Sequence, residues 1–231
     1  MCDSPPLKLR HRPLLALLII TFVSLGVAYS FATPVFESPD ESSHLTLVRY
    51  LSVHRALPPP GFAEAWYLGF HDPPLYYAPP LYYVGAARLT SWTQLDDLPA
   101  LMIPNPNWAL GFALQSDTSP WNKNVFVYPA TKTLAQSETV RAAYLLRLVS
   151  LGLGAITLLC VHAAARQLWP DRPGLRLSAA ALAAFNPQFI AASSGVTNDS
   201  LLNALFAAFF LGALRNMRAG AAWTRSPGRG C

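Results

Sequence analysis

The stretch PLLALLIITFVSLGVAYSFA, from Pro13 to Ala32, is an unbroken apolar run that follows a short basic tail at residues 1–12. A helix of about 20 apolar residues is long enough to cross the hydrocarbon core of a bilayer. Ser30-Phe31-Ala32 has the small-x-small pattern of a signal-peptide cleavage site, but the run is longer than the apolar part of a usual signal peptide. We therefore expect an uncleaved first membrane helix at residues 13–35, with the following residues outside the cytoplasm.

The amino-acid composition also points to a membrane protein. Of the 231 residues, 52% are hydrophobic and only 13% are charged, whereas soluble domains have about 25% charged residues. The net charge of +5 comes from basic residues that flank apolar runs, not from a basic patch with interleaved aromatics, which excludes nucleic acid as a partner. The three cysteines have neither the spacing of metal-ligand pairs nor that of a disulfide framework.

Three further apolar segments lie in the second half of the chain. They cover about 142–168, 177–196 and 201–214, so residues 140–218 are expected to hold membrane helices 2 to 4. Arginines cluster between the second and third segments and after the fourth, as expected of cytoplasmic segments. The sequence therefore predicts a multi-pass protein of the inner or plasma membrane with a cytoplasmic N-terminus and a cytoplasmic tail at 219–231.

Residues 36–139 contain no clean membrane span and are expected to form a large extracytoplasmic loop. The best candidate for a crossing, residues 79–92, is short and is interrupted by Gly85 and Arg88. A crossing there would also reverse every later segment and place the arginine clusters outside. Two near-repeats of Pro-Pro-Leu-Tyr-Tyr favour short helices at the membrane–water boundary. The predicted fold is an all-α membrane protein with about four membrane helices and interfacial helices after the first.

The first outer residues, ESPDESSH from Glu37 to His44, predict a helix that starts directly outside the membrane. Ser38 suits the N-cap, Pro39 the first helical position and Glu41 the closing position of a capping box. Asp40 would lie in the first turn, where free backbone N–H groups favour a negative charge. Two interpretations stay open here: the acids only stabilise the helix end, or they hold a metal, orient a phosphate-bound cation or take a proton.

The helix that follows Glu41 is expected to be amphipathic. Leu45, Val48 and Leu51 recur at helical spacing on its apolar side. The sequence places His44, with two arginines, on the polar side.

Two further polar positions are expected on the same side of the membrane. Asp199 lies in the tight connection between the third and fourth predicted spans. Arg147 lies in the apolar start of the second, where a cation is costly unless it has a partner or reaches the interface. Carboxylates beside an arginine suit an anionic lipid phosphate, because arginine binds phosphate oxygens in pairs and a carboxylate can act as a base or hold a divalent metal.

These stretches resemble the N-terminal part of the membrane-embedded GT-C glycosyltransferases. That class contains the protein O-mannosyltransferases, the aminoarabinose transferases and the RgtA/B/C/D-like enzymes of bacteria; the chain is also similar to bacterial membrane proteins of the DUF2142 type. The resemblance covers residues 14–214 and rests on the order of short motifs and on their placement on one side of the membrane. The motifs are SPDE from Ser38, HDPPLYY from His71, YLLRLVS from Tyr144, NPQF from Asn186 and NDS from Asn198.

Enzymes of this class transfer a sugar from a polyprenyl-phosphate carrier to an acceptor outside the cytoplasm. The resemblance implies that Asp40 is the catalytic base and that the substrate or its phosphate is bound by Glu41, His71, Arg147 and Asp199. Asp40 and Asp199 are also the residues that would hold a divalent metal, if the reaction uses one. The expected reaction is an inverting displacement, in which Asp40 deprotonates an acceptor hydroxyl as the lipid phosphate leaves.

Enzymes of this class have more than four membrane helices, and their later helices complete the cavity and bind the carrier. The polar, basic end of this sequence indicates a truncated transferase or one half of an enzyme whose partner chain supplies the remaining helices. The alternative function is a non-catalytic membrane subunit, or an inactive fragment, in cell-envelope polysaccharide assembly. A transporter fragment is a weaker alternative, because the sequence shows few charges deep in the spans and no clear pair of broken helices.

Overall fold

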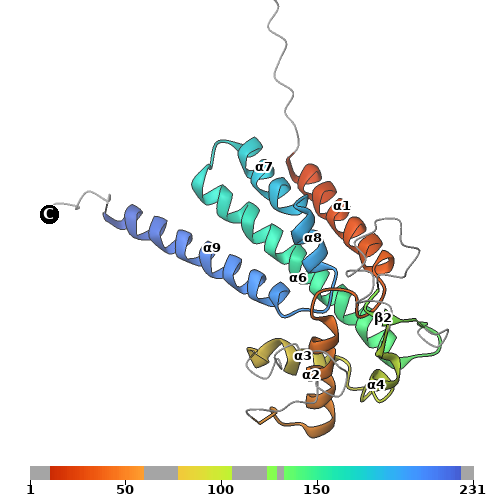
Figure 1. The fold of residues 1–231 in the computed structure, drawn as a ribbon. Helices are drawn as coiled ribbons and strands as arrows, with labels where there is room; N and C mark the ends of the chain where they lie inside the picture. Colours follow the sequence, from red (N-terminus) through yellow and green to blue (C-terminus); the bar gives the residue numbers. More distant parts are fainter. Residues whose placement is uncertain (1–10, 60–77, 106–123, 129–132, 225–231) are drawn as a thin grey trace, which may run out of the picture.

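The computed structural model describes residues 11–59, 78–105, 124–128 and 133–224. Its long helices lie together in a bundle, and short helices cover one end of that bundle (Figure 1). The elements are α1 (His11–Ala32), α2 (Glu41–His54), α3 (Pro80–Leu89), α4 (Leu98–Leu101), β1 (Ile103–Pro104), β2 (Phe126–Val127), α6 (Glu138–Leu168), α7 (Pro173–Ala184), α8 (Pro187–Ser193) and α9 (Asp199–Thr224).

Three helices in the described part of the chain are long and apolar enough to cross a membrane. They are the segments Arg12–Ala32, Glu138–Leu168 and Asp199–Ala219, in α1, α6 and α9. This finding confirms the expectation of a mostly helical membrane protein, with three such helices where the sequence predicted four. Between α1 and α6 the described residues form the short helices α2, α3 and α4, and the two-stranded antiparallel pair β1–β2 follows α4.

The segment expected to be the third membrane helix is broken into α7 and α8. α7 ends at Ala184, and α8 begins at Pro187, which has no backbone N–H for a continuing helix. Asn186 caps α8, because its side-chain oxygen accepts hydrogen bonds from the N–H groups of Gln188 (2.9 Å) and Phe189 (3.4 Å). The prediction of one continuous helix at 177–196 is therefore wrong.

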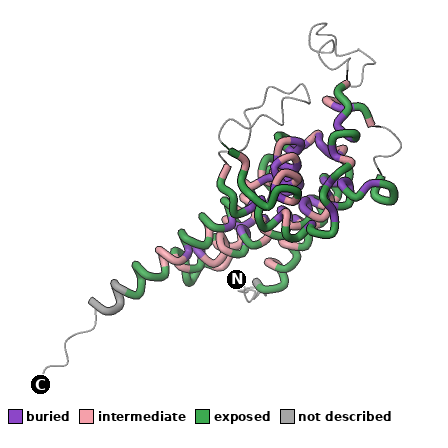
Figure 2. The backbone as a smooth tube through the Cα atoms, turned by 90° about the horizontal axis from the view of Figure 1, so that it is seen from below, coloured by how far each residue is buried: buried purple, intermediate pink, exposed green. Residues whose placement is uncertain are grey.

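Two apolar clusters hold the helices together. The first joins α1, α6 and α7, and its buried members are Leu18, Phe22, Leu151, Leu158, Ala180 and Ala184. The second lies where α2 and α3 meet the start of α6, and it includes Leu45, Val48, Tyr83, Leu146 and Val196. The buried residues are concentrated in the body of the molecule, whereas α9 is mostly exposed toward the C-terminus (Figure 2).

One end of the bundle brings together segments that are far apart in the sequence. The end of α1, the start of α6 and the start of α9 all lie at the end of the bundle from which α2 extends (Figure 1). The hydroxyl of Ser30, near the end of α1, donates to the backbone oxygen of Ser194 after α8 (2.9 Å). This end of the bundle therefore contains all the candidate site residues that the structure describes.

Candidate functional site

Glu41 and Arg147 form a fully buried ion pair between α2 and α6. The guanidinium donates from Nε to Oε1 (2.7 Å) and from Nη2 to Oε2 (2.6 Å) of the carboxylate. Nη1 also donates to the backbone oxygens of Ser30 (2.5 Å) and Thr33 (2.9 Å), and Nη2 to that of Pro34 (3.0 Å). All five N–H donors of Arg147 therefore bind protein oxygens.

The Glu41 carboxylate accepts two further hydrogen bonds from the backbone. Its donors are the N–H of Phe36 (2.8 Å) and the N–H of Val196 (3.0 Å). A bidentate contact with additional hydrogen bonds offsets the large desolvation cost of a buried charge pair. Glu41 thus links the turn before α2, the helix α6 and the connection between α8 and α9.

These contacts change the interpretation of two residues expected to bind substrate. Neither Glu41 nor Arg147 has a hydrogen-bonding group left for a phosphate, so the geometry gives the pair a structural role. The predicted capping box is also wrong: α2 begins at Glu41, its N-cap is Asp40, and the Glu41 side chain points to Arg147 instead of back to Ser38. The partner that an arginine in an apolar helix requires is Glu41.

Glu37 has a structural role that the sequence did not indicate. Its carboxylate accepts hydrogen bonds from the backbone N–H groups of Val125 and Phe126 (both 3.1 Å) and from the hydroxyl of Tyr128. Burial, together with the hydrogen bond to Glu37, raises the pKa of Tyr128 above its usual range. Glu37 therefore fixes β2 against the turn that follows α1.

A cavity of about 390 Å³ opens between the turn before α2 and the connection between α8 and α9. Asp40 lines it from the first segment and Asp199 from the second, and both residues are exposed. The end of α1 contributes Tyr29 and Thr33 to the same cavity. The structure therefore brings together the two aspartates that the sequence singled out, although they are far apart along the chain.

Asp40 adopts a backbone conformation that is unusual for a residue with a side chain. Its φ is 56° and its ψ is 8°, in the left-handed region, and its carboxylate makes no capping hydrogen bond to α2. This conformation costs of order 1 kcal/mol for a residue other than glycine, and aspartate and asparagine are among those that tolerate it best. The Asp40 side chain therefore makes no capping hydrogen bond to α2, and Asp40 lines the cavity.

Asp199 lies in the first turn of α9. Its backbone N–H donates to the hydroxyl of Thr197 (3.2 Å), which holds the start of the helix. The N-terminus of a long helix stabilises a carboxylate at this position. Asp199 therefore lies at the end of α9 that lines the cavity.

His44 is a residue of this cavity that the sequence did not single out. It is buried on α2, and its Nδ1 lies 2.8 Å from the hydroxyl of Tyr83 on α3. Burial lowers the pKa of His44 to about 4, against a smaller opposite effect of the negative charge of Asp199. Burial likewise raises the pKa of Tyr83, so both groups are neutral at pH 7. The sequence carried a signal for this placement, because positions 44, 48 and 51 also fall on one stripe of a helix.

The lowered pKa of His44 predicts a loss of stability in mild acid. The unfolded chain binds a proton at this residue near pH 6.5, whereas the folded chain does so only near pH 4. The contribution of neutral His44 is therefore complete above pH 6.5 and is lost as the pH falls toward 4. We expect His44 to make the protein about 2 kcal/mol less stable at pH 5 than at pH 7.

Thermal unfolding of the detergent-solubilised protein at the two pH values checks this. The variant His44→Gln should show a smaller difference between pH 7 and pH 5 than the wild type. An equal difference in both proteins would show that His44 does not titrate in this window.

Gly195 sets the distance between the two walls of the cavity. A Cβ atom at this position would lie 2.9 Å from Cβ and 3.0 Å from Oγ of Ser38. We expect Gly195→Ala to lower the free energy of unfolding by about 1–3 kcal/mol, because the connection must move away from the turn before α2. Gly212→Ala is the matched control, since a Cβ there meets no atom within 4 Å. Thermal unfolding of both variants tests this packing, and equal stability would contradict it.

Two further expectations concern His71 and a metal. His71 lies outside the described residues, so its expected role stays a prediction. Within the residues that the structure describes, no group of three or more His, Cys, Asp or Glu side chains is arranged to hold a metal ion. A divalent metal between Asp40 and Asp199 would therefore need further oxygen ligands from a substrate or from water.

No protein-family model matches the sequence, and no curated protein or solved structure shows a significant match to it. The class of the protein therefore follows from its own fold. The chain is a mostly helical protein with three helices suited to crossing a membrane and a polar cavity at one end of the bundle.

Proposed function

We propose that the chain acts as a membrane glycosyltransferase, which transfers a sugar from a polyprenyl-phosphate carrier to an acceptor outside the cytoplasm. The observation that carries the proposal is the cavity that Asp40 and Asp199 share. Both carboxylates are exposed there, and no capping bond to α2 accounts for that of Asp40. Among the described acids that line the cavity, Glu37 is bound by the protein itself, which leaves these two for a substrate.

The proposal includes four membrane crossings, of which the third is the broken pair α7 and α8. α6 and α9 both begin at the cavity end, so the chain must return through the bundle between them (Figure 1). Placed end to end, α7 and α8 would be about 28 Å long, close to the thickness of the hydrocarbon core of about 30 Å. In this proposed topology the opposite end, which carries the arginines, faces the cytoplasm, as positively charged segments tend to do, and the cavity opens at the outer surface.

The charge of the cavity suits the sugar better than the carrier phosphate. No Arg or Lys is among the described residues that line it, whereas Asp40, Asp199 and Glu37 are. Carboxylates accept hydrogen bonds from sugar hydroxyls, and the neutral His44–Tyr83 pair adds an uncharged polar contact. We therefore place the sugar between the two aspartates and the carrier phosphate outside this acidic region.

The proposed reaction is one displacement at the anomeric carbon of the sugar. The Asp40 carboxylate takes the proton of the acceptor hydroxyl, whose oxygen forms the new bond to that carbon. The bond from the same carbon to the carrier phosphate breaks, and polyprenyl phosphate leaves with the electron pair. Asp199 and His44 hold the sugar in position during this exchange.

The alternative, a non-catalytic subunit of cell-envelope polysaccharide assembly, is favoured by one observation. Glu37 and Glu41, two acids of the same outer turn, are bound by other groups of the protein and stabilise the fold. In a non-catalytic subunit, this end of the bundle would serve only as a rigid surface and not as a substrate-binding site.

Release of sugar from the carrier separates the two functions. Vesicles that contain the purified chain, and native membranes with or without its gene, are supplied with radiolabelled polyprenyl-phosphate sugars, and the label lost from the polyprenyl-phosphate carrier is measured. Native membranes are included because the proposal allows a partner chain to supply further helices. Gene-dependent release supports the transferase, whereas release that is the same with and without the gene supports the alternative.

A further inference from the structure

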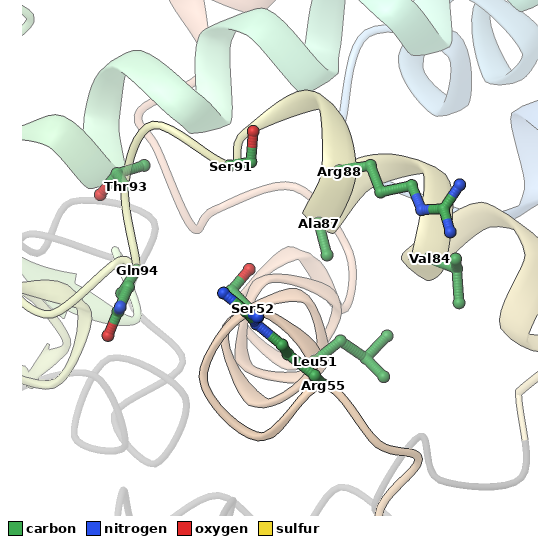
Figure 3. A pocket seen from close by; sticks show the side chains of 9 residues that line it. All are labelled: Leu51, Ser52, Arg55, Val84, Ala87, Arg88, Ser91, Thr93 and Gln94. Atoms are coloured by element: carbon green, nitrogen blue, oxygen red, sulfur yellow. The ribbon is translucent and has the colours of Figure 1, made fainter.

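A second cavity, of about 430 Å³, lies between α2 and α3 (Figure 3). Its polar lining residues are Ser52, Arg55, Arg88, Ser91, Thr93 and Gln94. Arg55 lies at the end of α2, Arg88 in the last turn of α3, and Ala87 points across the cavity toward α2 (Figure 3). The lining contains two cations and no acid, which is the reverse of the cavity that holds Asp40.

The two arginines are available to a ligand. Both are exposed, and within the described part of the chain no salt bridge includes either of them. Hydroxyl and amide groups of residues that follow α3 add further hydrogen-bond donors to the lining of the cavity. Guanidinium groups with such neighbours bind phosphate oxygens strongly and often in pairs.

The surroundings of this cavity are apolar and exposed. Leu57 (58% exposed) follows α2, and Leu89 (46%) and Trp92 (50%) lie next to residues that line the cavity. The guanidinium of Arg141 lies 5.9 Å from the ring of Trp92. Exposed tryptophan and leucine beside arginine are typical of a surface that rests on lipid headgroups. The same elements lie at the end of the bundle where α1 ends and α6 begins (Figure 1).

We propose that the cavity between α2 and α3 binds the phosphate group of an anionic membrane lipid, with Arg55 and Arg88 as its ligands. The apolar rim would contact the acyl region of the same lipid, which a free phosphate does not have. This binding fixes the outer helices on the bilayer surface. It rests on the membrane placement of the chain and not on sugar transfer, so each can fail without the other.

Lipid binding by the full chain in detergent tests the proposal. Bound lipids are counted by native mass spectrometry during titration with dioleoyl phosphatidylglycerol. We expect the double variant Arg55→Gln/Arg88→Gln to bind this lipid about tenfold more weakly than the wild type, because two charge-assisted contacts are lost. The variant Arg55→Lys/Arg88→Lys keeps both charges and should retain most of the binding.

Three controls make the outcome decisive. Arg215→Gln removes one exposed cation near the far end of α9 and should leave binding unchanged. Dioleoyl glycerol, which has the same chains and no phosphate, should bind weakly and equally to the wild type and the double variant. Inorganic phosphate should not displace the lipid at millimolar concentration. Unchanged phosphatidylglycerol binding by the double variant, an equal loss in Arg215→Gln, or displacement by inorganic phosphate would overturn the proposal.

Discussion

Replacement of Arg147 by alanine is expected to lower the free energy of unfolding by about 3–5 kcal/mol. The substitution leaves the Glu41 carboxylate fully buried without its cation, and it leaves backbone oxygens at the end of α1 without a donor. Unfolding of the detergent-solubilised protein by heat or by denaturant measures the loss. Because the fold depends on this ion pair, the Arg147→Ala variant should also be cleaved faster by a protease.

Arg141→Ala is the matched control for this prediction. Arg141 lies on the same helix, but its contact with Glu138 (3.6 Å) is on the surface, where such pairs contribute about 0–1 kcal/mol. In the double variant Glu41→Gln/Arg147→Ala the losses should not add, because both changes remove the same interaction. If the Arg147→Ala variant is as stable as the Arg141→Ala variant, the ion pair does not hold the site together.

Asp40→Asn is expected to reduce sugar release by about 100- to 10,000-fold, the usual contribution of a general base. Its stability should not change, because asparagine also tolerates the left-handed backbone of this position and no capping hydrogen bond is lost. Asp40→Gly should be equally inactive, yet about 1 kcal/mol more stable, since glycine adopts this conformation without strain. Activity and thermal unfolding are measured on the same preparations.

This pair of variants distinguishes a catalytic residue from a helix cap. A capping role predicts that both substitutions destabilise the protein and that activity falls only as folded protein is lost. Glu138→Gln removes another exposed acid from the same end of the bundle, outside the cavity, and should leave activity unchanged. Full activity of Asp40→Asn would contradict the proposed mechanism.

The membrane helices could be predicted from the sequence because length and hydropathy determine them directly. Residues 13–32 and 142–168 read as apolar runs and fall within α1 and α6. Asn186-Pro187 was a local signal for the break between α7 and α8. The mean hydropathy of the whole segment conceals the break, because apolar residues lie on both sides of it. The short elements between Asp96 and Tyr128 could not be predicted, because their sequence has no periodic pattern. Contacts with distant residues position them, such as the hydrogen bonds between Glu37 and β2.

The candidate site was predicted in part, for reasons that concern tertiary contacts. The topology predicted from the sequence put Asp40 and Asp199 on one side of the membrane, and in the structure both line one cavity. Local spacing made Glu41 look like a capping residue, because a capping box and a buried ion pair need the same residue type there. Only the packing of α6 against α2 reveals Arg147 as its partner. His44 was assigned to the polar side because histidine is polar, although its helical position matches the buried stripe.

The central claim is that Asp40 and Asp199 face one cavity at the outer surface of the membrane. Cysteine pairs test it in a chain whose native cysteines are replaced by serine: Asp40→Cys/Asp199→Cys, with Asp40→Cys/Arg215→Cys as the control. Arg215 lies about 24 Å from Asp199 along α9, at the rise of a helix. We expect a short thiol cross-linker to join only the first pair, and a membrane-impermeant maleimide added to intact cells to label positions 40 and 199. Absence of that cross-link, or labelling of either position only after the membrane is opened, would contradict the claim.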